Sequence, residues 1–165
     1  MMVDIETLST RVTARVLQVA VVVFDSKRVI DERMWLMDPQ RQHSRHVDIG
    51  TLSFWLRENP QRLQSLIDRG DTSIEDLYSD LLAMRDKYKP EGWWANSPSF
   101  DLVILEDLFK SARLVSPWSF RQAFDVRTLS YLTGRKLIKA EAAKQHDALN
   151  DALAQARWVI NVVSQ

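Results

Sequence analysis

Asp4 and Glu6 are two acids separated by one residue, in a run from Met2 to Glu6 that otherwise favours a β-strand. Side chains alternate along a strand, so both carboxylates lie on one face of the sheet, about 7 Å apart. Two like charges on a buried strand are costly unless a cation or hydrogen bonds compensate them. A divalent metal ion is the simplest compensation. The alternative is an exposed strand end with two solvated acids.

Asp101 is a third acid in an apolar setting. On the helix that the pattern predicts here it shares a face with Leu105 and Leu108, so its carboxylate projects from the apolar side. The alternative is an ordinary first-turn acid that faces the helix dipole, worth less than about 1 kcal/mol when exposed. Glu106 and Asp107 lie on other faces, and we expect both to be solvated.

His146 and Asp151 stand at the start of the last predicted helix. Asp151 flanks a stripe of small residues that includes Ala148 and Ala152, and small residues let a helix approach a sheet closely. The carboxylate therefore comes within reach of the first strand, and His146 is turned toward the same place. Asp147 is better explained as an N-cap or first-turn acid.

Three motifs that contain these residues resemble those of the DEDDh 3′-to-5′ exonuclease superfamily, also called DnaQ-like. The motifs are Asp4-Ile-Glu6, Asn96-Ser-Pro-Ser-Phe-Asp101 and His146-x-Ala-x-x-Asp151. Their order and spacing match over nearly the whole chain. The short length and the helix around Thr51-Leu-Ser-Phe-Trp55 are most similar to the exonucleases of phages and prophages and to related bacterial exoribonucleases.

The resemblance implies a two-metal hydrolase. Asp4 would bridge two divalent ions, Mg²⁺ or Mn²⁺, Glu6 and Asp151 would complete the first, and Asp101 would hold the second. His146 would be the general base that takes a proton from the attacking water, a task suited to the ordinary histidine pKa of about 6.5. The substrate would be single-stranded RNA or DNA, or a 3′ overhang, and the product a nucleoside 5′-monophosphate. The choice between RNA and DNA stays open, because it depends on contacts to the 2′-hydroxyl.

The element pattern predicts a single α/β domain over residues 1–165, with a ribonuclease H-like mixed sheet and helices on both faces. Strands over 2–6, 16–24 and 29–37 are expected to form an antiparallel meander, with parallel strands after it. The other expected elements are a strand at 92–96, an apolar stretch at 120–126, and helices at 47–58, 61–69, 72–89, 100–114 and 147–163. A capping-box pattern, Thr72-Ser-Ile-Glu75, opens the third helix.

Charge is balanced over the chain, with 22 basic and 22 acidic residues, so a nucleic acid must be held by a local patch or through metal. Residues 111–145 carry seven basic and two acidic residues, a net charge of +5, and lead directly into His146. A basic loop there would hold the phosphates behind the scissile one, and a solvated surface loop is the alternative. The best candidates are Arg135, Lys136 and Lys139.

Further substrate contacts are expected near the motifs. Thr7 and Leu8 follow the first motif, where family members usually carry a smaller pair, and Leu8 would wedge against the terminal base. Trp55 is a candidate for base contact, since aromatic faces stack on unpaired bases. Asn96, in the second motif, is the fourth candidate. The other tryptophans are expected to pack in the core.

Two other functions remain open at this stage. One is a catalytically silent interaction protein that retains the exonuclease fold, and the other is hydrolysis of very short oligonucleotides or another small phosphodiester. Loss of a metal ligand would favour the silent protein, but all four acids and the histidine are present. A zinc site at His43, His46 and Asp48 is disfavoured, because structural zinc needs four ligands and the chain has no cysteine.

Several protein classes are excluded by composition. The absence of cysteine rules out a disulfide scaffold and an iron–sulfur cluster, and four scattered glycines make no phosphate-binding loop. The longest apolar run, Val16 to Phe24, is too short to span a bilayer, and Met1-Met2-Val3 makes no secretory leader. We therefore expect a cytoplasmic protein, in the host cytoplasm if a phage encodes it, with no membrane partner. Several family members are homodimers, so a second copy is a candidate partner.

Overall fold

The computed structural model describes residues 1–137 and 146–164 and has a five-stranded sheet in the order β3-β2-β1-β4-β5. The first three strands form an antiparallel meander, whereas β4 pairs in parallel with β1, and β5 with β4. The strands are β1 (Met2–Thr7), β2 (Val16–Phe24), β3 (Val29–Leu36), β4 (Trp93–Ala95) and β5 (Ala123–Asp125). The predicted α/β fold, with a meander and added parallel strands, is confirmed.

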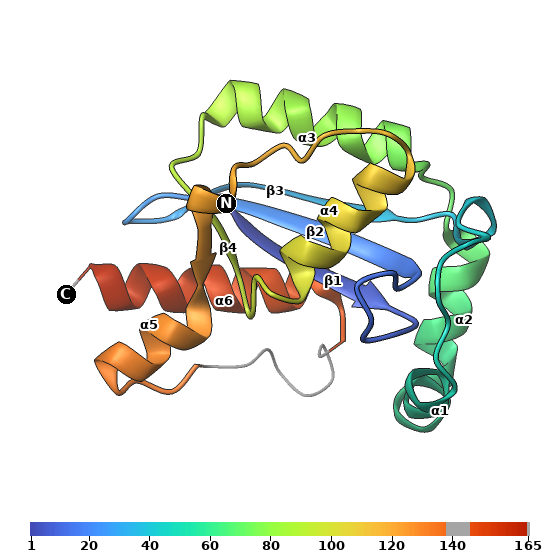
Figure 1. Ribbon diagram of the computed structural model, residues 1–165. Helices are drawn as coiled ribbons and strands as arrows, with labels where there is room; N and C mark the ends of the chain where they lie inside the picture. The colour runs from blue at the N-terminus through green and yellow to red at the C-terminus, as the bar shows by residue number, and fades with distance from the viewer. Residues whose placement is uncertain (138–145, 165) are drawn as a thin grey trace.

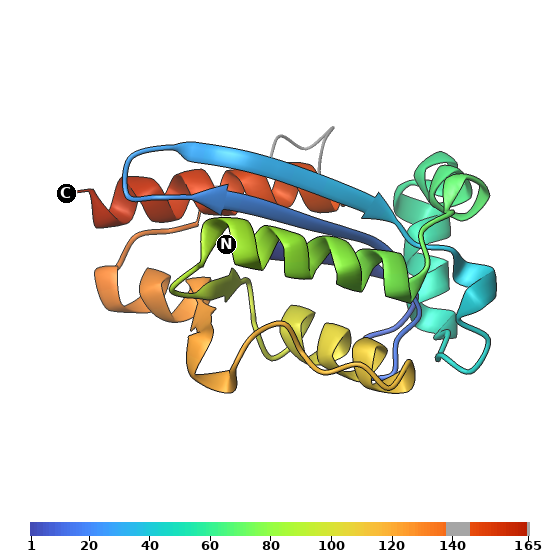
Figure 2. The ribbon, with the colours of Figure 1, turned by 90° about the horizontal axis from the view of Figure 1, so that it is seen from above.

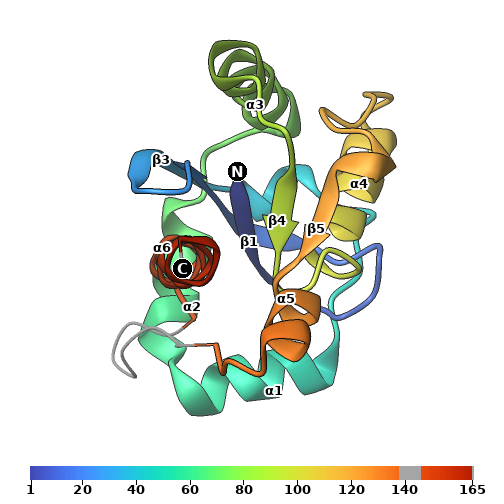
Figure 3. The same ribbon diagram turned by 90° about the vertical axis from the view of Figure 1, so that its left-hand side faces the viewer.

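Helices cover both faces of this sheet, as Figure 1 and the end-on view in Figure 3 show. Helices α3 (Ile74–Tyr88) and α4 (Asp101–Ser111) pack on one face, and α6 (Ala148–Val163) packs on the other. Figure 2 shows α3 and α6 running along the strands on the two sides. Strand β2 is apolar at nearly every position, which suits a central strand buried on both faces.

Two further helices, α1 (Ile49–Glu58) and α2 (Pro60–Arg69), lie beyond the end of β1 (Figure 1). Asp48 caps α1 by accepting a hydrogen bond from the Thr51 amide at 2.8 Å. Asn59 ends α1 and caps α2, whose first position is Pro60, a residue with no amide hydrogen to satisfy. Within the described residues, no helix is long and apolar enough to cross a membrane.

Helix α5 (Val126–Thr133) lies within the segment that we expected to be a basic loop. Asp125 caps it by accepting from the Arg127 amide at 3.0 Å, and Gly134, at φ 66°, ends it in a left-handed conformation. The helix has only eight residues, which is too short to stand out from a loop in the sequence, and Tyr131 and Leu132 are exposed on it. The remaining short elements are the 3-10 helices η1 (Pro39–Arg41) and η2 (Phe120–Gln122).

The cap of α3 is Ser73 rather than the expected Thr72. The Ser73 hydroxyl accepts from the Asp76 amide at 3.0 Å and donates to the Asp76 carboxylate at 2.6 Å. The capping pattern is therefore displaced by one residue, and Asp76 takes the place expected for Glu75.

Glu106 and Asp107 are not merely solvated, contrary to expectation. Asp107 accepts from Arg45 at 2.9 Å, and the Arg45 side chain is only 4% exposed. Glu106 accepts from the indole nitrogen of Trp118 at 2.7 Å. Replacing Asp107 would leave a buried guanidinium without its counter-charge, so neither acid is a neutral control for the site.

Candidate active site

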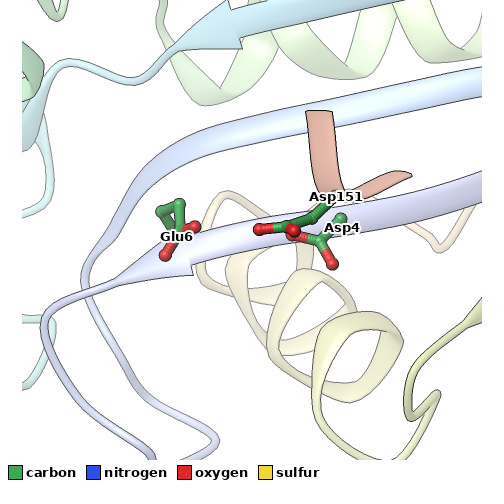
Figure 4. Close-up of side chains that lie close together, drawn as sticks. All are labelled: Asp4, Glu6 and Asp151. Carbon is green, nitrogen blue, oxygen red and sulfur yellow. The ribbon is translucent and has the colours of Figure 1, made fainter. Parts of the chain in front are cut away.

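Three carboxylates converge on the face of β1 that looks toward α6 (Figure 4). Asp4 and Glu6 extend from the strand, and Asp151 comes from the first turn of α6. Carboxylate oxygens of the three lie within 4.8 Å of one another. Strand β2 places Ala20 opposite Asp4, and α6 meets the sheet through buried alanines, so both neighbours leave room for the acids.

Asp101, at the start of α4, reaches the same strand and is 4% exposed. Strand β4 is short and pairs with β1 only through Met2 and Trp94. Farther along β1, beyond the pairing with β4, the Ile5 amide donates to the Asp101 carboxylate at 3.2 Å. The early end of β4 thus lets a helix carboxylate stand beside Asp4.

Burial raises the pKa of all four carboxyl groups. The pKa of Asp4 rises well above its usual range, first through burial and then through the charges of Asp101 and Glu6. Burial and the charge of Asp151 raise the pKa of Glu6 to about 8. Without a bound cation, such a cluster of acids retains protons. A cation among the acids would relieve the repulsion between their ionised forms.

Glu6→Gln gives a test of this electrostatic cost in the metal-free protein. Because the folded state raises the pKa of Glu6 from 4.5 to about 8, the protonated form stabilises the fold fully below about pH 4.5. That contribution is lost as the pH rises toward 8. We therefore expect the melting temperature of the Glu6→Gln variant to exceed that of the parent by a margin that grows across this window, reaching several degrees.

The prediction concerns the difference in melting temperature between the variant and the parent. Every other titrating group is present in both proteins, so its contribution cancels in that difference. One of these is the buried amino group of Met1, whose pKa burial lowers to about 5. Thermal scans of both proteins from pH 4.5 to 8 make the measurement. A margin that is constant over that range, or that shrinks with rising pH, would contradict the raised pKa.

Gln155 is a neighbour of the site that the motifs do not include. Its amide nitrogen donates to the Asp4 carboxylate at 2.8 Å, while its amide oxygen is buried without a partner among the described residues. It lies one helical turn after Asp151 on α6. The sheet-facing side of α6 is otherwise apolar, so a polar residue there is the sequence signal that could have identified Gln155.

Arg62 ties α2 to the start of α6. It donates to the Asp147 carboxylate and, at 3.0 Å, to the side-chain oxygen of Gln18, which also accepts from the Ala148 amide at 3.2 Å. Asp147 caps α6 through the Asn150 amide at 3.1 Å, as predicted. Gln18, which interrupts the apolar run of β2, was the sequence signal for this polar contact.

His146 precedes α6 in a left-handed backbone conformation, at φ 60°. Its amide donates to the Asp151 carboxylate at 3.1 Å. The imidazole packs edge-on against Phe54 and Trp55 of α1, with centroid distances of 5.1 and 6.1 Å. The histidine is thus held between the acid of α6 and the aromatic side of α1.

A cavity of about 460 Å³ opens beside Glu6. Strand β1 contributes Thr7 to its wall, α1 contributes Phe54 and an edge of Trp55, and Phe100 adds a third aromatic side chain. The Thr7 hydroxyl is bound to the Ser9 carbonyl at 2.7 Å. This hollow lies next to the carboxylates and has aromatic walls.

Two of the expected substrate contacts are core residues. Trp55 is 2% exposed, and its indole nitrogen donates to the Thr7 carbonyl at 3.0 Å, so it has almost no free face for a base. Leu8 is 5% exposed and packs with Trp55, Leu17 and Leu63. The wedge expected of Leu8 and the stacking expected of Trp55 are therefore corrected, and partly buried Phe54 is the aromatic side chain on the cavity.

The remaining predicted contacts lie toward α5 or outside the described residues. The Asn96 amide oxygen accepts from Arg127 at 3.2 Å. Arg135 and Lys136 follow α5 and are exposed, and the Lys136 carbonyl accepts from Trp158 at 2.9 Å. Lys139 lies outside the described residues.

The histidines near α1 form no metal cluster among the described residues. His46 shares a hydrogen bond of 2.8 Å with the Ser9 hydroxyl, and Asp48 is the cap of α1. Among the described residues, the group of acids suited to a metal ion is that of Asp4, Glu6 and Asp151.

The arrangement of sheet and helices is shared with a solved exonuclease structure. The chain is similar to the solved structure of Exonuclease X in complex with 5′ overhanging duplex DNA, with a TM-score of 0.51 and 19% sequence identity. The match covers 98% of this chain and 90% of that one, and it shows the shared fold. No curated protein matches the sequence.

A comparison of the sequence with protein-family models identifies the family to which the chain belongs. The family model described as the 3′-5′ exoribonuclease Rv2179c-like domain matches residues 1–163. The chain therefore belongs to this family, and it is a 3′-5′ exonuclease of the DEDDh superfamily.

Proposed function

We propose that the chain is a two-metal 3′-5′ exonuclease, which hydrolyses single-stranded RNA or DNA, or 3′ overhangs, to nucleoside 5′-monophosphates. The observation that carries this proposal is the cluster of Asp4, Glu6 and Asp151, with oxygens within 4.8 Å, beside the buried Asp101. The loss of a metal ligand would favour a catalytically silent protein, but all four acids and His146 are present in the described part of the chain.

The donor set fits hard divalent cations. Carboxylate oxygens are the ligands that Mg²⁺ and Mn²⁺ prefer, and the burial that raises the pKa of these acids makes a cation the natural counter-charge. Asp4, Glu6 and Asp151 would hold one ion, and Asp4 and Asp101 the other. Two such ions stabilise both the attacking and the leaving oxygen of an in-line phosphoryl displacement.

The side chains around the acids supply orientation and proton transfer. Gln155 fixes the Asp4 carboxylate through its 2.8 Å hydrogen bond, as partners of metal ligands commonly do. His146 accepts a proton from the attacking water, and its backbone is anchored to Asp151. Arg62 and Gln18 fix the start of α6, where His146 and Asp151 are located.

The cavity beside Glu6 suits the 3′-terminal nucleoside. Its volume of about 460 Å³ lies in the range of small-ligand sites, and Phe54 and Phe100 offer faces for a base. The family description favours RNA, whereas Exonuclease X was solved with duplex DNA that has a 5′ overhang. Both support a nucleic-acid substrate for this chain.

His146→Ala tests the proton transfer. We expect kcat to fall by about 10²- to 10⁴-fold, the usual contribution of a general base, with a flatter acid limb in the pH–rate profile. The matched control is His43→Ala, which removes an exposed histidine outside the site and should leave the profile unchanged. An unaltered pH–rate profile in His146→Ala would exclude the base role.

A further inference from the structure

A second hollow, of about 220 Å³, lies along α5. Asn96, at the end of β4, and the α5 residues Arg127, Ser130 and Tyr131 contribute to its wall. In Figure 1, α5 and α1 lie on opposite sides of the start of α6. Asp151 belongs to the first turn of that helix. The cavity beside Glu6 has its wall on α1, whereas this hollow has its wall on α5.

Arg127 brings a positive charge to the inner end of the hollow. Its guanidinium donates to the side-chain oxygen of Asn96 at 3.2 Å and to the Asn96 carbonyl at 3.4 Å, which holds it in place. Asn96 opens the segment that leads into α4, whose first residue is Asp101, so the bond to Asn96 places Arg127 on the side of the site that carries this acid. An exposed guanidinium beside a phosphodiester site is suited to a backbone phosphate.

Tyr131 lies one helical turn after Arg127, so both side chains extend from the same side of α5. Tyr131 is 86% exposed, an unusual state for a large aromatic ring in a protein whose other large rings are mostly packed. A ring that is free on the surface next to a fixed cation offers a stacking face beside a phosphate contact. Single-strand binding sites combine these two features.

The positive charge on the protein surface indicates the direction in which the bound nucleic-acid strand leaves the reaction centre. The 3′-terminal nucleoside is the end of the nucleic acid and needs only a closed hollow. The rest of the nucleic-acid strand, which leads away from the scissile bond, carries further phosphates. Exposed Arg135 and Lys136 follow α5 and continue the positive charge that begins at Arg127. No comparable group of basic residues lines the cavity beside Glu6 in the described part of the chain.

We propose that Arg127 and Tyr131 form the subsite for the nucleotide immediately 5′ of the scissile phosphate, with Arg127 on its backbone phosphate and Tyr131 stacked on its base. This inference rests on the proposed function, because it takes the carboxylate cluster as the reaction centre. It also takes the cavity beside Glu6 as the place of the terminal nucleoside. Stacking is tolerant of sequence, so the subsite accepts any base.

Two substrates separate this subsite from the reaction centre. The 4-nitrophenyl ester of uridine 5′-monophosphate offers the terminal nucleoside and the scissile phosphate, but no preceding nucleotide. A short single-stranded oligouridylate offers all three. Both are assayed with Mn²⁺, and thermal scans confirm that each variant is folded, as expected for exposed positions.

We expect Tyr131→Ala to lower kcat/KM about tenfold more on the oligouridylate than on the ester, because it removes one stacked base. Tyr131→Phe keeps the ring and should retain the parent ratio. Arg127→Gln should reduce the slope of log kcat/KM against log salt on the oligouridylate by about 0.7, the value for one lost phosphate contact. The matched control is Arg157→Gln, an exposed arginine on α6, which should change neither substrate.

Equal losses on the two substrates, or no loss on either, would overturn the subsite while leaving the proposed function intact. Hydrolysis of neither substrate by the unaltered chain would overturn the proposed function and the subsite together. A preferential loss in Tyr131→Ala that Tyr131→Phe shares would overturn the stacking role.

Discussion

Asp4→Asn is expected to abolish hydrolysis, with kcat lower by about 10³-fold or more. Asp4 is the acid whose pKa is raised by burial and by the charges of all three other carboxylates, and its oxygens lie within 4.8 Å of those of Glu6 and Asp151. In the proposed site Asp4 is shared by two metal ions, and removing such a ligand takes away several kcal/mol of transition-state stabilisation. Each 1.4 kcal/mol is about a tenfold change in rate. The assay follows mononucleotide release from single-stranded RNA with Mg²⁺ or Mn²⁺.

The same variant should be more stable than the parent when metal is absent. Asparagine has nearly the shape of aspartate and keeps an oxygen that accepts from Gln155. It is neutral without binding a proton, whereas Asp4 must either bury a charge beside Asp101 and Glu6 or take up a proton on folding. We expect a melting temperature higher by several degrees at neutral pH in EDTA. Loss of activity with a gain of stability is the signature of a residue kept for function.

Asp68→Asn is the matched control for Asp4→Asn. Asp68 is an exposed acid on α2, and its carboxylate is bound to Gln64 at 2.7 Å. We expect activity and stability close to those of the parent, since surface changes of this kind are usually within about 0.5 kcal/mol. Normal hydrolysis by Asp4→Asn, with this control also active, would remove Asp4 from the site.

Removal of divalent ions is the second large effect. EDTA should abolish hydrolysis completely while the fold persists, because the hydrophobic clusters on both faces of the sheet do not involve the acids. Mg²⁺ or Mn²⁺ should restore activity and raise the melting temperature. A free ion at 100 times its dissociation constant adds about 2.7 kcal/mol of stability.

Circular dichroism and thermal scans with and without ions check this prediction. The rise in melting temperature should be largely absent in Asp4→Asn, which separates binding at this cluster from binding elsewhere. Hydrolysis that continues in excess EDTA, or an equal rise in the parent and in Asp4→Asn, would contradict a metal site among these acids.

The fold was accessible from the sequence because its long elements carry strong patterns. The apolar run of β2 and the small-residue stripe of α6 predicted a central strand and a closely packed helix, and both are confirmed. Helix α5 was missed because its eight residues span only about two turns, too short a window for a pattern to stand out from a loop. Its existence depends on a side-chain cap and a terminal glycine, which are weak signals when taken alone.

The acids of the candidate site were identifiable because charge in an apolar pattern demands an explanation. Burial of Asp101 followed from the helical face on which it lies. The polar contacts around the acids were not accessible, since they form only through the packing of α6, α2 and α5. Gln155 contacts Asp4, whereas Arg62 and Arg127 bind neighbours of the acids, Asp147 and Asn96. Trp55 and Leu8 were misassigned because an aromatic or apolar residue near a motif packs in the core as readily as it contacts a substrate.

End-labelled RNA tests the central claim most directly. The parent chain and Asp4→Asn are incubated with single-stranded RNA labelled at the 5′ end or at the 3′ end, with Mn²⁺ or with EDTA. With Mn²⁺ the parent should release the 3′ label at once as a mononucleotide and shorten the 5′-labelled strand as a ladder, and neither EDTA nor Asp4→Asn should allow this. Release of the 5′ label first, internal cleavage, or an intact strand with Mn²⁺ would contradict the account.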